Sequence, residues 1–205
     1  MRPMVLNLDY AEELSKKLDE YDDLKDKVYD LSRKIIKNSK LCIYAIRRKE
    51  YDKAKSYLDD IEKMRAEIYD LIKDNLKLAS VNIVSTADQE YVEALALYYF
   101  VTKGEIPRAE EIGVSVQEYV AGVMDSAGEM LRLATDYLIE GKIEEAEKIR
   151  DAIEKIYVFM LHVNPRDYEL RRKIDYVSNV LNKLQEFIFY KKVLGPVKRI
   201  TGTEE

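Results

Sequence analysis

Hydrophobic residues recur at helical spacing along most of the chain. From Asp9 to Arg48 they follow the period of an α-helix with no Gly or Pro, which predicts one long helix. Its apolar face consists of Leu31, Ile35, Cys42 and Ile46. A second helix is predicted from Glu50 to Lys77, and its apolar residues are Tyr57, Leu58, Ile61, Met64, Ile68, Leu71 and Ile72. No segment alternates convincingly with the period of a strand, so the pattern predicts an all-helical protein.

Residues typical of helix ends divide the middle of the chain. Thr86 and Gln89 have the spacing of a capping box, in which two side chains bond the free backbone N–H groups of a helix start. Gly104 ends this third helix. Ser115 and Glu118 repeat the capping-box spacing and predict the start of a fourth helix. The residues between these signals, 104–115, contain Gly and Pro and form the longest predicted irregular stretch.

The last two helices are marked in the same way. Gly141 is placed to cap the C-terminus of the fourth helix, and the fifth helix spans residues 143–163. Asn164 followed by Pro165 predicts the start of a sixth helix, because Asn is a good N-cap residue and Pro fits the first turn. This helix is predicted to run to about Lys192.

The composition of the chain favours a single helical domain. Its 205 residues include only 7 Gly and 4 Pro, so turns are few, and 47% are hydrophobic, which is enough for a sizeable core. No run of about 18 uncharged apolar residues occurs, so no membrane span is expected. The N-terminus has no apolar secretory signal, which favours a cytoplasmic location. We predict an all-α bundle of six or seven helices over residues 1–194 and a flexible tail over 195–205.

Residue counts exclude several classes of catalytic site. The single cysteine, Cys42, rules out an internal disulfide and a cysteine-based zinc cluster. The single histidine, His162, rules out a two-histidine ribonuclease mechanism and is expected to be a core or interface residue. No Gly-x-x-x-x-Gly-Lys or Gly-x-Gly-x-x-Gly phosphate loop is present, so a nucleotide-hydrolysing fold has no anchor.

Charged residues are segregated along the chain although the net charge is only −5. Residues 32–55 contain nine Lys or Arg and two acids, and residues 166–199 contain nine and four. One face of the first helix carries the residues that we term the basic stripe: Arg33, Lys37, Lys40, Tyr44 and Arg47. Such a surface suits a nucleic-acid backbone, because each neutralised phosphate releases counterions. The alternative is that the basic stripe is simply a solvent-exposed face, or that it pairs with acidic helices of this or another subunit.

Two acidic residues interrupt an otherwise apolar part of the third helix. Between Asp88 and Lys103 the only charges are Glu90 and Glu93, and residues 94–102 carry none. A helix that is apolar all round is expected to be buried. Residues three apart lie on the same side of a helix, so these carboxylates repel each other when both are ionised. Burial makes this costly unless cations or protons compensate.

The fourth helix repeats this arrangement with Asp125 and Glu129, which lie four residues apart. Four acids on two adjacent core helices can form one cluster. Ligation by carboxylates alone selects hard cations such as Mg²⁺ or Mn²⁺. A bound ion of this kind next to a basic surface suggests metal-assisted phosphodiester cleavage. The alternative is that each acid pairs with Arg132, Lys103 or the basic stripe.

Several motifs, taken in order, resemble the translin/Trax family. The motifs are DLSRKIIKNSK at residues 30–40, AIRR at 45–48, QEYVEA at 89–94, YVAGVMDSAGE at 119–129 and LRRKID at 170–175. The most specific are QEYVEA and the Gly-Val-x-Asp-x-x-Gly-Glu pattern within the fourth motif. The resemblance extends, in the same order, over nearly the whole chain.

The resemblance implies a fold and an activity. That family is all-helical, binds RNA and single-stranded nucleic acid, and assembles into hollow octamers. Its Trax branch carries a Mg²⁺-dependent endoribonuclease site built from acids at the positions of Glu90, Glu93, Asp125 and Glu129, whereas translin-branch chains have basic residues at the first two. This chain therefore resembles a Trax-type catalytic subunit. Its loop at 104–115 is short where eukaryotic Trax chains carry a long insertion, which resembles archaeal members assembled from one chain type.

Our hypothesis is a metal-dependent endoribonuclease that acts inside a homo-oligomeric shell, an octamer by resemblance, whose inner wall carries the basic stripe. Glu90, Glu93, Asp125 and Glu129 would hold Mg²⁺ or Mn²⁺, and one of them could instead act as general base. The residues expected to grip the nucleic-acid backbone are Arg33, Lys37, Lys40, Arg47, Arg48, Arg171 and Arg172. Two alternatives stay open: a non-catalytic oligomer that binds single-stranded RNA or DNA and whose acids are structural, and a helical scaffold with no nucleic-acid role.

Overall fold

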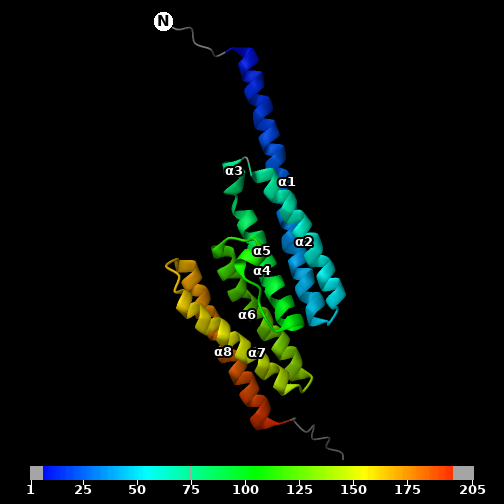
Figure 1. The fold of residues 1–205 in the computed structure, drawn as a ribbon, viewed down its shortest axis with the longest axis vertical. Coiled ribbons are helices and arrows are strands. Elements are labelled where there is room, and N and C mark those ends of the chain that lie inside the picture. Colours follow the sequence, from blue (N-terminus) through cyan, green and yellow to red (C-terminus); the bar gives the residue numbers. More distant parts are fainter. Residues whose placement is uncertain (1–6, 74, 196–205) are drawn as a thin grey trace, which may run out of the picture.

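In the part of the chain that the structure describes, six long helices are joined by connections that contain two single-turn helices (Figure 1). The computed structural model describes residues 7–73 and 75–195. The long helices are α1 (Leu8–Arg47), α2 (Tyr51–Ile72), α4 (Asn82–Lys103), α6 (Val116–Ile139), α7 (Ile143–Val163) and α8 (Tyr168–Leu194). The single-turn helices are α3 (Leu76–Ala79) and α5 (Ala109–Ile112). No strand occurs in either described range, so the predicted all-α bundle is confirmed.

The helices pack in an order that follows the chain, with α4 and α6 at the centre (Figure 1). α1 lies between α2 and α4, while α6 contacts α4 on one side and the α7–α8 pair on the other. The first turns of α1 extend beyond the rest of the bundle (Figure 1). The four candidate acids therefore lie on the two central helices of the bundle.

The predicted apolar face of α1 forms part of the core. Leu31, Ile35, Cys42 and Ile46 are all buried. His162 is instead exposed at the end of α7, where its Nδ1 lies 2.8 Å from the carbonyl oxygen of Val158. A core position for His162 is therefore wrong.

The two ends of the chain are only partly described. The predicted tail lies outside the described residues, except for Gly195, which follows the last residue of α8. Within the described ranges, no helix is both long enough and apolar enough to cross a membrane.

Two predicted helix boundaries in the first half of the chain are wrong. α2 ends at Ile72 rather than at Lys77, and Asn75 starts the separate helix α3 by accepting a hydrogen bond from the backbone N–H of Leu78 at 3.2 Å. α4 begins at Asn82, one turn before the predicted capping box. Thr86 is therefore inside the helix, and its hydroxyl donates to the carbonyl oxygen of Asn82 at 3.1 Å.

Two other helix starts differ from the prediction in how they are capped. Ser115 is the N-cap residue of α6, but no capping box forms, because Glu118 accepts a hydrogen bond from the Ser85 hydroxyl at 2.6 Å. Asn164 ends α7 in the left-handed conformation, with φ of 46°, instead of starting α8. The side chain of Asp167 caps α8. Asn serves both roles, since it is a good N-cap and also tolerates positive φ.

The predicted irregular stretch 104–115 contains α5 and is anchored by a buried arginine of α2. Arg65 Nε donates to Asp88 of α4 at 2.6 Å, and its other nitrogens donate to the carbonyl oxygens of Ile112 at 3.3 Å and Gly113 at 2.9 Å. The Tyr69 hydroxyl donates to the second oxygen of Asp88. This network joins α2, α4 and the end of α5, and it fixes the turn of α4 that immediately precedes the candidate acids.

Gly122 allows α4 and α6 to approach closely. A Cβ atom at Gly122 would lie 2.6 Å from the carbonyl oxygen of Gln89 and 2.6 Å from the Cβ of Val92, which is closer than real Cβ atoms pack. The two backbones therefore nearly touch at this point. Gln89 and Val92 immediately precede Glu90 and Glu93, so this contact sets how near the acids of α4 lie to α6.

We expect Gly122→Ala to lower the free energy of unfolding by about 1–3 kcal/mol, as overpacking does in other cores. Helix propensity alone predicts the opposite, a gain of about 1 kcal/mol for Gly→Ala inside a helix. Chemical denaturation followed by circular dichroism measures the difference. A variant as stable as the parent would contradict the close contact between the two backbones.

Candidate functional site

Four carboxylates from α4 and α6 lie near one another, as the sequence predicted. Glu90 and Glu93 come from α4, and Asp125 and Glu129 come from α6. The negative charges of the other three all raise the pKa of Glu93, which places Glu93 among them. The side chains of Asp125 and Glu129 expose only 23% and 12% of their surface, so water screens their charges weakly. We term these four residues the acid cluster.

The acid cluster carries more negative charge than its surroundings readily stabilise. Burial raises the pKa of Glu93 to about 8, and the charges of Asp125, Glu90 and Glu129 act in the same direction. Burial also raises the pKa of Glu90, although Lys40 opposes this shift. The cluster is therefore more stable with an added proton or an added cation near neutral pH.

Three of the four carboxylates have a cationic partner. The pairs are Lys40 with Glu90 at 3.7 Å, Lys173 with Asp125 at 2.5 Å, and Arg132 with Glu129 at 3.0 Å. Pairing with Arg132 and with the basic stripe is thus confirmed, whereas Lys103 lies over the Tyr99 ring, 4.1 Å from its centre. In the described part of the chain, Glu93 forms no ion pair. Protein cations therefore neutralise the cluster only in part.

The donor atoms of the acid cluster suit a hard divalent cation, but they are not arranged to coordinate one. All of them are carboxylate oxygens, and Glu129 Oε2 is buried without a hydrogen-bond partner. Over residues 7–73 and 75–195, no three Asp, Glu, His or Cys side chains are close enough to hold a metal ion together. Binding an ion would require the carboxylate side chains to move closer together.

Two residues that contact Asp125 are not among those predicted from the sequence. Gln89 Nε2 donates to Asp125 Oδ2 at 2.5 Å, and Lys173 Nζ donates to both carboxylate oxygens at 2.5 and 2.6 Å. Lys173 is 48 residues from Asp125 in sequence, so only the packing of α8 on α6 reveals the contact. The available sequence signal is that QEYVEA contains Gln89 and LRRKID contains Lys173.

α8 approaches α6 closely beside the acid cluster. A Cβ atom at Gly128 would lie 2.2 Å from the hydroxyl oxygen of Tyr176. Burial raises the pKa of Tyr176, and the charges of Asp125, Glu93 and Glu129 raise it further. The Tyr176 hydroxyl therefore stays protonated at neutral pH and remains a hydrogen-bond donor next to the acids.

The cations of the basic stripe differ in their availability to a ligand. Arg33 and Lys37 are exposed on α1, and the Lys40 side chain is 61% exposed beside Glu90. Arg47 instead donates to both oxygens of Asp136 on α6, from Nε at 2.9 Å and Nη2 at 3.0 Å. This bidentate pair holds the end of α1 on α6, so Arg47 has fewer donors left for a phosphate.

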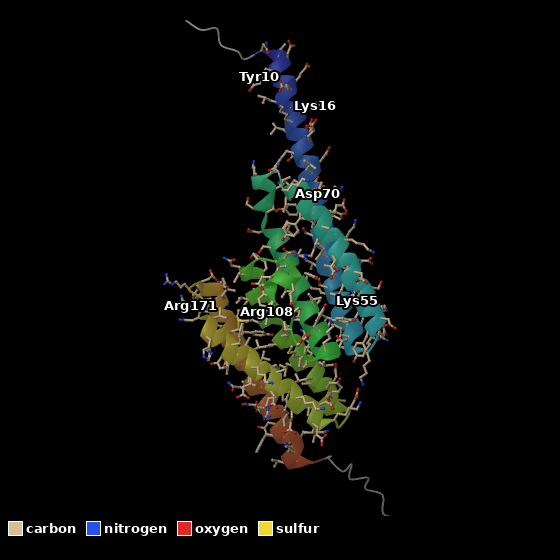
Figure 2. All side chains as sticks on the ribbon, viewed as in Figure 1. Tyr10, Lys16, Lys55, Asp70, Arg108 and Arg171 are labelled. Carbon is tan, nitrogen blue, oxygen red and sulfur yellow. The ribbon has the colours of Figure 1, made fainter. Side chains whose placement is uncertain are left out.

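The remaining predicted binding residues lie in two places. Arg48 pairs with Glu50 at 3.2 Å at the end of α1. Arg171 is exposed at the start of α8, well separated from α1 (Figure 2), and Arg172 pairs with Glu169 at 3.2 Å. A surface hollow of about 300 Å³ is lined by Asp125, Glu169, Arg172, Lys173 and Tyr176. Cations from α1 and from α8 therefore approach the acid cluster by separate routes.

Comparison with known families identifies the family of the chain that carries this site. A model of the translin family matches residues 23–195. The chain belongs to the translin family. It is also similar to the uncharacterized protein MJ0175 of Methanocaldococcus jannaschii, with 28% identity over 207 residues that cover 96% of this chain and 91% of that protein.

Solved structures with the translin fold resemble this chain over nearly their whole length. Apo-NeC3PO has a TM-score of 0.82 and 38% identity, covering 92% of this chain and 99% of that chain. AfC3PO in complex with duplex RNA has a TM-score of 0.81 and 22% identity, covering 92% of this chain and all of that chain. At this lower identity the similarity to AfC3PO shows the shared fold alone.

We expect Glu93→Gln to change how stability depends on pH. The folded pKa of about 8 lies above the ordinary value of 4.5, so between these pH values the folded protein binds a proton that the unfolded chain does not. The stability of the parent protein should therefore fall as pH rises through this range. The variant lacks the carboxylate, so its Tm should exceed that of the parent by several degrees at about pH 9 and by much less at about pH 5.

Differential scanning calorimetry at both pH values measures this effect, with Glu105→Gln as the control because Glu105 is exposed just beyond α4. The Tm of the control should equal that of the parent at both pH values. If the two variants change Tm equally, or the parent has the higher Tm at about pH 9, the raised pKa of Glu93 is wrong.

Proposed function

We propose that the protein is an endoribonuclease that depends on Mg²⁺ or Mn²⁺ and acts as a homo-oligomer. The observation that carries the proposal is the incomplete neutralisation of the acid cluster. Glu93 has three acidic neighbours that raise its pKa and, among the described residues, forms no ion pair, while the charge of Lys173 opposes the shift only in part. Such a carboxylate costs stability, and groups with strongly shifted pKa values are typical of functional sites.

The residues of the cluster have distinct roles in this proposal. Glu90, Glu93, Asp125 and Glu129 would hold the ion, which when bound supplies an activated water and stabilises charge on the scissile phosphate. Gln89 orients Asp125 through its hydrogen bond. The buried, unpaired Oε2 atom of Glu129 supports the proposal, because a buried oxygen without a partner is unfavourable unless something binds to it.

Nucleic acid would approach the acid cluster along its cationic flanks. Lys40 of α1 lies on one side, and Arg172 and Lys173 of α8 line the hollow on the other. The solved complex of AfC3PO with duplex RNA has the same fold, which supports RNA as the ligand. Contacts to phosphates do not read bases, so single-stranded DNA fits the same surface.

Enclosure would reconcile the negative net charge with a polyanionic ligand. The chain carries a net charge of −5, yet residues 32–55 and 166–199 are both basic. A closed homo-oligomer, with eight copies as the family resemblance implies, could turn these segments toward an internal cavity and the acidic segments toward solvent. Like charges would then repel the ligand only outside the shell.

A second candidate function is a non-catalytic oligomer that binds nucleic acid. The observation in its favour is the contact of Lys173 with both oxygens of Asp125, which neutralises one candidate ligand without a metal ion. In this case the acids would only join α4 to α1 and α6 to α8 by ion pairs.

Replacing two exposed cations of the basic stripe should weaken RNA binding and its dependence on salt. For Arg33→Gln with Lys37→Gln, we expect the slope of log K against log salt to fall by about 1.5, since each lost phosphate contact removes about 0.7–0.9. Fluorescence anisotropy with a labelled single-stranded RNA measures the slope. The control, Lys16→Gln with Lys17→Gln, makes the same charge change nearer the start of α1, where both lysines pair with glutamates. Equal slopes for the two double variants would contradict a role for the stripe.

Removing a single carboxylate of the cluster should abolish cleavage but not binding. We expect Asp125→Asn and Glu93→Gln to lower the rate of Mg²⁺-dependent RNA cleavage at least about a hundredfold, because each removes a charged oxygen donor. The control is Glu118→Gln, at the far end of α6, which should cleave at the parent rate. A gel assay of labelled RNA in Mg²⁺ and in EDTA gives both cleavage and retained binding.

The same assay separates the candidate functions. Binding without cleavage under Mg²⁺ or Mn²⁺ would support the second candidate. No binding, even at low salt, would leave only a helical scaffold without a nucleic-acid role. Cleavage at the parent rate by Asp125→Asn and Glu93→Gln would show that the active site lies elsewhere.

A further inference from the structure

Lys173 occupies the part of Asp125 that a metal ion would use. Its ammonium group lies 2.5 Å from Oδ1 and 2.6 Å from Oδ2, and Gln89 also donates to Oδ2 at 2.5 Å. Both side chains of the Lys173–Asp125 pair are about three-quarters buried, with 26% and 23% exposed. This is the most enclosed contact between the acid cluster and a lysine, since Lys40 is 61% exposed.

An ammonium group and a divalent cation cannot share this position. Magnesium and manganese bind carboxylate oxygens at about 2.0–2.2 Å, so an ion on Asp125 would meet the positive charge of Lys173 at contact distance. Both also need the same lone pairs of the carboxylate. An ion would bind Asp125 only where the ammonium group has moved away.

We propose that Lys173 is an exchangeable counter-ion of the acid cluster, which holds Asp125 in the metal-free protein and competes with the divalent cation for it. This inference rests on the proposed function, because it concerns the same carboxylates. It assigns Lys173 a regulatory role, since the residue sets how tightly the site takes up the ion.

Charge balance favours the exchange. With all four carboxylates ionised, the cluster and its three cations Lys40, Arg132 and Lys173 keep one negative charge in excess. Exchanging the single charge of Lys173 for a divalent ion removes this excess. The ammonium group alone therefore neutralises the cluster incompletely, which leaves a driving force for the ion.

A second carboxylate lies within reach of the Lys173 side chain once the ion displaces it. Lys173 lines the surface hollow together with Glu169, which lies four residues earlier on α8 and is 68% exposed. Residues at this spacing face each other on a helix, so Glu169, whose Oε2 already accepts from Arg172 at 3.2 Å, offers its carboxylate as a solvated second partner. A lysine side chain has a long, flexible stem, so it can reach this position without any movement of α8.

Calorimetric titration with Mn²⁺, in the absence of RNA and at constant pH and ionic strength, tests the inference. We expect Lys173→Met and Lys173→Gln to bind Mn²⁺ about tenfold more tightly than the parent, which corresponds to the loss of one competing charged hydrogen bond. Lys173→Arg keeps a competing cation and should bind close to the parent affinity. Using two neutral variants guards against one of them failing to fold, which circular dichroism reveals.

Two further lysine variants separate displacement from a general effect of charge. Lys40→Met also removes one positive charge beside the cluster, but Lys40 is 3.7 Å from Glu90 and exposed, so its effect should be clearly smaller. Lys183→Met removes a charge ten residues farther along α8, where the ammonium group lies over the Phe187 ring, and should bind as the parent does. The direction of the change is itself informative, because a residue that only supports the fold would weaken ion binding when replaced.

The possible results distinguish this inference from the proposed function. If the parent binds Mn²⁺ and Asp125→Asn abolishes binding, but the neutral Lys173 variants bind no more tightly, the competition is wrong and the metal site stands. The same conclusion follows if Lys40→Met and Lys173→Met tighten binding equally. If the parent binds no Mn²⁺ that depends on Asp125, both the metal site and the competition are overturned.

Discussion

The site depends on the direct packing of α4 on α6, which brings four carboxylates into one partly buried space. Gly122 removes the side chain that would hold the two helices apart, so the acids of α4 lie among those of α6. Charges in such a place must be compensated. The compensation comes from three different helices, with Lys40 on α1, Arg132 on α6 and Lys173 on α8. The acid cluster therefore determines how the surrounding helices place their cations.

Local neutralisation also decides which cations are left for a ligand. Arg47 belongs to the basic stripe by its spacing, yet it is committed to Asp136 and joins the end of α1 to α6. Arg33 and Lys37, one to two turns earlier than Lys40, are exposed. A stripe read from the sequence thus contains two kinds of residue, and the tertiary contact of each cation distinguishes them. The net charge of the chain reveals neither kind of cation, because it sums over segments of opposite sign.

The sequence predicted the long helices and the two pairs of acids that each share one helix face, because both depend on periodicity within one helix. It was less successful at helix ends, where one residue type serves several roles. Thr86 bonds within its helix instead of capping it, and Asn164 ends one helix instead of starting the next. It anticipated that acids of two helices could meet and pair with the basic stripe, but it did not show which residues of the other helices contact each acid. Lys173 reaches Asp125 across 48 residues, and no spacing rule within a helix relates them.

The pattern Gly-Val-x-Asp-x-x-Gly-Glu has a structural meaning in this chain. Asp125 lies midway between Gly122 and Gly128, and each glycine permits a close approach on a different side of α6. The first lets α4 touch the backbone, and the second admits the hydroxyl of Tyr176 from α8. Tyr176 is three residues from Lys173 on the same face of α8, so the second glycine also allows the lysine to reach Asp125. The two glycines thus place one carboxylate between its acidic neighbours and its counter-ion, and larger residues there would separate these groups even if every charged side chain were kept.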